Sequence, residues 1–141
     1  MYSEVSVSAR NASFAGEVWL YTSDEQLRNL AEKIRGFPAT SSDTREFILG
    51  GFGPQWAGGA VHMCFRCEGS VGHSLVELQR ESGPGMAGIV QTCHLFVSIE
   101  ASGVDEFVPQ LLALANKGRK VAVLPAWYPL AEEMIREDRE R

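Results

Sequence analysis

Residues 16–38 read GEVWLYTSDEQLRNLAEKIRGFP and contain a strand pattern followed directly by a helix pattern. The first part, 16–22, is rich in β-branched and aromatic residues, which favours a strand. The spacing of the apolar residues then becomes helical, with one face formed by Leu27, Leu30, Ala31 and Ile34. Ser23 and Gln26 have the spacing of a capping box, and Gly36 with Pro38 is typical of a helix end. This stretch therefore predicts a strand joined to a capped helix.

The segments on either side of this unit have mostly strand patterns. Residues 3–9, SEVSVSA, alternate between polar and apolar side chains and are expected to form an antiparallel hairpin with 16–22 around residues 11–15. Four further strands are predicted after the helix, at 44–50, 60–68, 74–80 and 89–100.

A second helix is predicted after the last of these strands. Ser102 and Asp105 have the spacing of another helix start, and a wide apolar stripe runs from Val104 to Ala115. Pro109 lies inside the stripe, so the helix either begins late or is kinked there. Gly118 is expected to end it.

The last part of the chain predicts a short strand and a helical tail. Residues 119–124, RKVAVL, suit a strand, and PAWYP follows as a rigid turn. The charged segment LAEEMIREDRER has a narrow helical stripe, formed by Leu130, Ala131, Met134 and Ile135. We assign 1–118 to one α+β domain and 119–141 to a C-terminal strand and helix extension of the same domain.

Because the strands come mostly in consecutive runs, the expected fold class is α+β. The predicted architecture is a mainly antiparallel sheet of about six strands, with two capped helices packed on one face.

The bulk composition narrows the classes of function. The chain has 141 residues and a formal net charge of −5, which argues against a nucleic-acid partner. No apolar run reaches the ~20 residues of a membrane span, and the first residues lack the features of a signal peptide. An odd number of cysteines, three, favours free thiols in a reducing compartment. These features predict a cytoplasmic protein with no membrane contact.

Cysteine and histidine residues raise the question of a metal site. Cys64 and Cys67 form C-x-x-C on a predicted strand, where this spacing places the two sulfur atoms on opposite faces. Cys67 and Cys93 are interpreted as core residues. His62, Cys64 and His94 are expected on the outward face, with Glu77 or Glu100 nearby, which leaves a metal or small-ligand site there as an alternative.

No motif for catalysis or for a cofactor is found in the sequence. A G-x-S-x-G elbow and a P-loop lysine are both absent, so no catalytic residue and no cofactor are predicted. An enzyme whose residues assemble from distant loops stays open.

Aromatic residues in two loops are the predicted binding residues. Phe52 and Trp56 lie in the glycine-rich stretch 50–59, and Trp127 and Tyr128 lie in PAWYP. Such side chains either anchor a partner or fold back onto the core. The second pair, with the tail, also suits a homodimer contact.

Four stretches, GEVWLYTSDEQLRNLAEKIRGFP, TREFILG, VHMCFRC and HLFVSIEASGVDEFVPQLLAL, together resemble small uncharacterised bacterial proteins, some of them immunity-like partners of toxins. The resemblance covers roughly residues 5–115 and rests on element order and helix caps. It implies a bacterial protein that binds another protein, without assigning functional residues. A non-enzymatic binding domain, acting on another protein or on a second copy, is the first hypothesis, and the acidic charge suits a basic partner.

Overall fold

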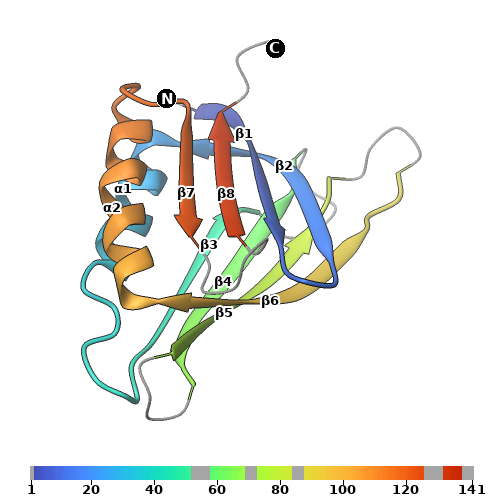
Figure 1. Ribbon diagram of the computed structural model, residues 1–141. Helices are drawn as coiled ribbons and strands as arrows, with labels where there is room; N and C mark the ends of the chain where they lie inside the picture. The colour runs from blue at the N-terminus through green and yellow to red at the C-terminus, as the bar shows by residue number, and fades with distance from the viewer. Residues whose placement is uncertain (1, 52–57, 69–72, 84–87, 126–131, 138–141) are drawn as a thin grey trace.

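The computed structural model describes residues 2–51, 58–68, 73–83, 88–125 and 132–137 (Figure 1). The first half of the chain contains β1 (Tyr2–Arg10), β2 (Ala15–Ser23), α1 (Asp24–Ile34), β3 (Thr44–Gly50) and β4 (Ala60–Cys67). The second half contains β5 (His73–Glu81), β6 (Thr92–Glu100), α2 (Ala101–Ala115), β7 (Val121–Pro125) and β8 (Glu132–Glu137). The α+β class is confirmed.

The described strands form two antiparallel sheets of four strands each, so the prediction of one sheet with about six strands is wrong. Sheet A has the order β2-β1-β8-β7, and sheet B has the order β3-β4-β5-β6. Sheet B is a simple meander, in which each strand pairs with the next one along the chain. The predicted β1–β2 hairpin is confirmed, but it pairs with the C-terminal strands and packs across sheet B.

The predicted helical tail is also wrong, because residues 132–137 form β8. This strand pairs with β1 on one side, where Val7 lies opposite Ile135, and with β7 on the other, where Ala122 lies opposite Ile135. Ile135 is fully buried. Hydrogen bonds to two neighbouring strands and burial of this side chain outweigh the helical spacing of the tail, since propensity is a weak prior.

Helix α1 begins as its sequence predicts. The Oγ atom of Ser23 accepts a hydrogen bond from the backbone N–H of Gln26 at 3.1 Å, which satisfies one free donor of the first turn. The Gln26 side chain does not complete the capping box, because its Oε1 atom accepts from the Thr22 hydroxyl at 2.7 Å. Gly36, with φ of +74°, follows the end of the helix.

The C-terminal end of α1 is held by Arg45 on β3. One guanidinium nitrogen donates to the carbonyl oxygens of Arg35 (2.6 Å) and Lys33 (3.2 Å), which satisfies acceptors that the helix leaves unpaired. The same guanidinium pairs with Asp43 and lies 5.6 Å from the ring centroid of Phe37. Hydrogen bonds from Arg45 and from a backbone N–H hold the pKa of Asp43 below its usual range.

Helix α2 differs from its prediction at both ends. It begins at Ala101, its N-cap is Glu100, and no side chain caps it, so the predicted Ser102 start is wrong. A late start before Pro109 is also excluded, because the helix runs through this residue. At the C-terminal end, the helix stops at Ala115, and the residue with a left-handed backbone is Lys117 (φ of +64°) instead of Gly118. The N–H of Gly118 donates to the Ala113 carbonyl at 2.8 Å.

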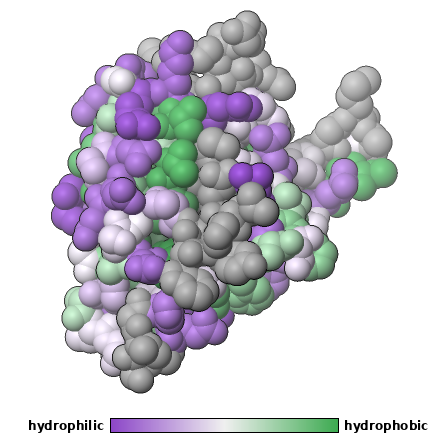
Figure 2. All heavy atoms as spheres, viewed as in Figure 1, coloured by the Kyte–Doolittle hydropathy of each residue, from purple (hydrophilic) through white to green (hydrophobic). Residues whose placement is uncertain are grey.

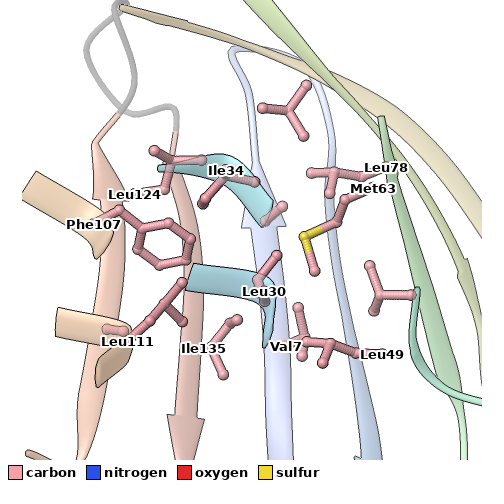
Figure 3. Close-up of a cluster of buried hydrophobic side chains, with 14 of the residues drawn as sticks. Val7, Leu30, Ile34, Leu49, Met63, Leu78, Phe107, Leu111, Leu124 and Ile135 are labelled. Carbon is pink, nitrogen blue, oxygen red and sulfur yellow. The ribbon is translucent and has the colours of Figure 1, made fainter. Parts of the chain in front are cut away.

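One continuous hydrophobic core joins both sheets and both helices. Figure 3 shows side chains from all these elements pointing toward one another: Val7, Leu30, Ile34, Leu49, Met63, Leu78, Phe107, Leu111, Leu124 and Ile135. The two helices lie side by side and pack on each other, with α1 also against β2 and β3 and α2 against β6 and β7. On the helical side of the molecule, Figure 2 shows mainly hydrophilic side chains. The core thus occupies the inner side of sheet B and leaves its other side outward.

The tip of the β1–β2 hairpin reaches the edge of sheet B. The side-chain Nδ2 atom of Asn11 donates to the carbonyl oxygen of Phe96 on β6 at 2.9 Å. A Cβ atom on Gly16 would lie 2.7 Å from the Sγ atom of Cys93, so a larger residue here would require the Cys93 side chain to shift. These contacts tie the hairpin to the outer strand of sheet B.

Candidate functional site

The outward side chains of β3 to β6 form the candidate site, which we name the sheet-B face. Side chains alternate along each strand, so the inward positions are buried in the core and the intervening positions point away from it. The register sorts the outward positions into four complete rows across the sheet. They are Gly50–Ala60–Glu81–Thr92, Ile48–His62–Gln79–His94, Glu46–Cys64–Glu77–Phe96 and Thr44–Arg66–Leu75–Ser98.

Glu77 is the centre of the ionic contacts on the sheet-B face. Its two carboxylate oxygens accept separate hydrogen bonds, one from Arg66 at 2.6 Å and one shared with the Nε2 atom of His94 at 2.7 Å. The bond from Arg66, followed by that from His94, lowers the pKa of the Glu77 carboxyl. The same Glu77 bond raises the pKa of Arg66. Glu77 therefore stays ionised and holds two neighbouring side chains in place.

Phe96 lies beside this ionic centre on the edge strand β6. The Arg66 guanidinium lies 5.8 Å from the centroid of the Phe96 ring, and the His94 ring lies 5.1 Å from it. Phe96 is nevertheless 42% exposed. A large aromatic side chain is thus held at the surface by cation–π and ring contacts rather than buried.

A second histidine–carboxylate pair lies at the opposite edge. The Nε2 atom of His62 lies 3.1 Å from the Oε2 atom of Glu46, and the Glu46 side chain is 62% exposed. Ile48, directly opposite His62 in the register, is 49% exposed. Each edge of the face therefore combines an exposed apolar side chain with an imidazole and a carboxylate.

The predicted outward placement of His62, Cys64 and His94 agrees with the structure, but the three side chains do not converge. His62 bonds to Glu46 and His94 to Glu77, while strand β5 lies between the two histidine strands, which puts their backbones about 10 Å apart. Among the described residues, no group of three or more potential metal ligands is found. The structure therefore lends no support to the metal-site alternative.

Cys64 and Cys67 of the C-x-x-C sequence lie on opposite faces of β4, as their spacing predicts. Cys67 packs against the hydrophobic core, whereas Cys64 lies on the sheet-B face, so the two thiols are on opposite sides of β4. The Sγ atom of Cys67 donates to the Thr40 carbonyl at 3.4 Å. Cys93 also packs against the core, and all three cysteines are free.

The four predicted binding aromatics, Phe52, Trp56, Trp127 and Tyr128, lie outside the described residues. Sequence reasoning missed Ile48 and Phe96 as exposed apolar side chains. It also left open whether Glu77 or Glu100 accompanies the histidines. Strand alternation could have found the two apolar residues, but the choice of Glu77 needs the register of β5 and β6.

No helix in the described part of the chain is long and apolar enough to cross a membrane. Comparisons with protein-family models, with curated proteins and with solved structures found no match to this chain. The chemistry of the sheet-B face is therefore the basis for a functional assignment.

Proposed function

We propose that this chain is a protein-binding domain of the bacterial cytoplasm and that the sheet-B face is its docking surface. The observation that carries the proposal is the pairing of exposed apolar side chains, Ile48 and Phe96, with a preorganised ionic centre on an open sheet face. Aromatic and arginine side chains are enriched among residues that dominate binding energy at protein interfaces.

The dimensions of the face suit a protein partner. Four strands about 4.8 Å apart and some eight residues long give a projected area on the order of 500 Å². Standard interfaces bury about 800 Å² of accessible surface on each partner. Because side chains protrude from the sheet, the accessible area of this face exceeds its projected area and comes close to that size.

The fixed geometry of the polar groups also supports recognition. Arg66 and His94 are already held by Glu77, so a partner that docks on them meets side chains with little conformational freedom left to lose. Binding to a pre-ordered surface costs less entropy than binding to mobile side chains. The pre-ordered polar groups around Glu77 therefore support the protein-binding proposal.

The test compares two exposed aromatic residues on different sheets. Phe96→Ser removes the anchor, and Tyr21→Ser removes a side chain of similar exposure (49% against 42%) from sheet A. A partner captured from bacterial lysate is identified, purified and measured directly by calorimetry against the wild type and both variants. Because the chain resembles immunity-like proteins, toxins belong among the candidate partners. Light scattering tests whether the chain binds a second copy of itself.

We expect Phe96→Ser to lower the affinity for the purified partner about 30-fold, which is the effect of a typical hot-spot residue. Tyr21→Ser is expected to change this affinity less than about twofold. Equal affinity for the wild type and Phe96→Ser, or equal weakening by both variants, would show that the partner docks elsewhere.

A further inference from the structure

The two sheets have four edge strands, β2 and β7 in sheet A and β3 and β6 in sheet B. On its outer side, an edge strand has a row of backbone N–H and C=O groups that no neighbouring strand pairs. A strand of another protein can pair with such a row. Hydrogen bonds from other parts of the chain to these groups decide which edge is open to a partner.

Three of the four outer edges are bonded to a segment from outside their own sheet. The pairs are the Gly59 N–H with the Trp19 carbonyl at 2.9 Å (β2), the Asn11 side chain with the Phe96 carbonyl at 2.9 Å (β6) and the Val123 N–H with the Gln110 side chain at 3.0 Å (β7). Within the described part of the chain, no other segment bonds to the outer backbone of β3. Strand β3 is therefore the edge at which a further strand can be added.

The alternation of hydrogen bonds in sheet B shows which way each backbone group points. The Glu68 N–H donates to the His73 carbonyl at 3.0 Å, which makes this a hydrogen-bonded pair of β4 and β5. In an antiparallel ladder such pairs alternate with non-bonded ones, so every second residue of β4 points its backbone toward β5 and the residues between point toward β3. The bond from the Ser82 N–H to the Gln91 carbonyl at 2.8 Å, past the other end of β5, gives the same alternation.

This alternation leaves the backbone of Glu46 and Ile48 on the outer edge. The residues of β4 that point toward β3 lie opposite Arg45, Phe47 and Leu49, which therefore make the ladder bonds of β3. The N–H and C=O groups of Glu46 and Ile48 point away from β4. Four backbone groups are thus available to an added strand.

The side chains of the same two residues lie on the sheet-B face. The Glu46 side chain is 62% exposed, and Ile48 is 49% exposed. Every second side chain of an added strand would lie beside them on this face. A segment at the β3 edge would thus extend the sheet-B face by one strand.

Glu46 determines the charge of the segment that fits. Its carboxylate lies 3.1 Å from the Nε2 atom of His62 and is still largely exposed. A lysine or arginine directly opposite Glu46 would make a favourable cross-strand pair of opposite charges. Arg45 does not oppose this cation, because its side chain lies on the other side of the strand and pairs with Asp43.

The charge argues against a second copy of the chain at this edge. Two copies with a net charge of −5 each repel one another. A second β3 strand also offers no cation to Glu46, because its side chains on this face are those of Thr44, Glu46 and Ile48, followed by Gly50.

We propose that a partner protein adds an extended, positively charged segment to the outer edge of β3, antiparallel to this strand. An apolar residue of the segment lies opposite Ile48, and a lysine or arginine two positions later lies opposite Glu46. Each of these two residues of β3 exchanges two backbone hydrogen bonds with the residue opposite. The proposal rests on the docking function proposed above and adds the conformation and the charge of the partner segment.

The experiment adds the peptide STVVKTS, blocked at both ends, to the ¹⁵N-labelled full chain at low salt and maps the changes in amide shift. In the proposed register the first valine lies opposite Ile48 and the lysine opposite Glu46. The first control is STKVVTS, which has the same composition and exchanges the residues at these two positions. The second control has N-methyl groups on the first valine and on the lysine of STVVKTS, which removes the two donors that face β3.

We expect STVVKTS to shift the amides of β3 and to bind about tenfold more tightly than either control peptide. Three results would overturn the proposal: no shift of β3 amides at millimolar peptide, shift changes centred on another element, or equal binding of the N-methylated peptide.

Variants of the chain test the same edge from the protein side. Ile48→Pro removes an outward N–H that makes no ladder bond, and proline is tolerated at such positions of edge strands. Ser98→Pro is the matched control on β6, where the alternation also points the N–H outward. Ile48→Ala keeps the N–H and loses only the side chain. Circular dichroism verifies the fold of each variant.

We expect Ile48→Pro to bind STVVKTS about tenfold more weakly than the wild type does, Ile48→Ala about threefold and Ser98→Pro less than about twofold. Equal binding by Ile48→Pro and the wild type would contradict pairing at β3.

If Ile48→Pro does not fold, Glu46→Lys tests the edge through its charge at an exposed side chain. This variant is expected to bind STVVKTS about tenfold more weakly and to prefer STVVETS, in which glutamate replaces lysine. A Glu46→Lys protein that still prefers STVVKTS would show that the segment does not lie beside Glu46.

The docking function fails separately, because it is measured with Phe96→Ser on β6, three strand spacings or about 14 Å from β3. A partner that depends on Phe96 but binds the wild type and Ile48→Pro equally leaves the docking function standing and removes strand addition. Light scattering adds one more outcome. A dimeric wild type with a monomeric Ile48→Pro variant would place a second copy at the edge and overturn the proposal.

Discussion

Truncation of Ile135 tests the strand that the sequence does not predict. Ile135 is fully buried on β8, where it lies opposite Val7 of β1 and Ala122 of β7. Replacement of a buried isoleucine by alanine costs about 2–5 kcal/mol, through lost transfer energy and the cavity that remains. We therefore expect Ile135→Ala to lower the free energy of unfolding by about 3 kcal/mol.

The assay is urea unfolding followed by circular dichroism. With an m value of about 1.5–2 kcal/mol per molar, a loss of 3 kcal/mol moves the midpoint by about 1.5–2 M. The control is Arg136→Ala at the next position, where the side chain is exposed and the expected change is within about 0.5 kcal/mol.

The alternative to β8 is the charged helical tail that the sequence pattern suggests. In such a tail Ile135 would belong to a narrow stripe at the surface, and its truncation would cost little. A change of less than about 1 kcal/mol for Ile135→Ala, similar to that of Arg136→Ala, would refute the burial of this strand between β1 and β7.

Two further predictions concern the ionic centre and the contact between hairpin and sheet. Glu77→Gln removes the charge that pairs with Arg66 and His94, and we expect the urea midpoint at pH 7 to fall by a few tenths molar. Because these partners depress the folded-state pKa of Glu77, its stabilising contribution exists above the unfolded pKa of about 4.3 and is lost as pH falls through the lower folded value. The difference in urea midpoint between the wild type and Glu77→Gln should thus disappear in acid. A difference that stays constant down to pH 2 would contradict the ion pairing. Gly16→Ala places a Cβ atom against the Cys93 thiol and is expected to cost about 1–3 kcal/mol. Adding Cys93→Ala should recover most of this loss in a double-mutant cycle, and additive costs would show that the clash lies elsewhere.

Local signals in the sequence predicted the elements well. The change of period at Ser23, with its hydroxyl as N-cap, located the first strand-to-helix junction, and strict alternation located β3, β4 and β5 within a residue or two. These signals depend on near neighbours in the chain, so a single sequence contains them.

The arrangement of the elements depends on contacts that the local pattern does not contain. Strands β1 and β8 are separated by about 130 residues in the sequence, and only their pairing in the folded chain creates a second sheet. For the same reason, a helical spacing of apolar residues around Met134 and Ile135 was misleading.

The candidate site was predicted in part. Alternation along β4 and β6 was enough to put His62, Cys64 and His94 on one face. It could not show that each histidine has its own carboxylate, because cross-strand neighbours follow from register, and a shift of one residue would exchange the two faces.

The position of β8 between β1 and β7 has a consequence for the order in which the fold is completed. Sheet A joins the first described strand to the last one, so its hairpin β1–β2 has no inner neighbour while the ribosome is still adding the residues before 132. Sheet B, by contrast, is a meander of successive strands and has all its hydrogen-bonding partners once residue 100 has been made. The half of the molecule that presents the histidines can therefore pair its strands first during synthesis, whereas the half that supports it must wait until β8, residues 132–137, has been made.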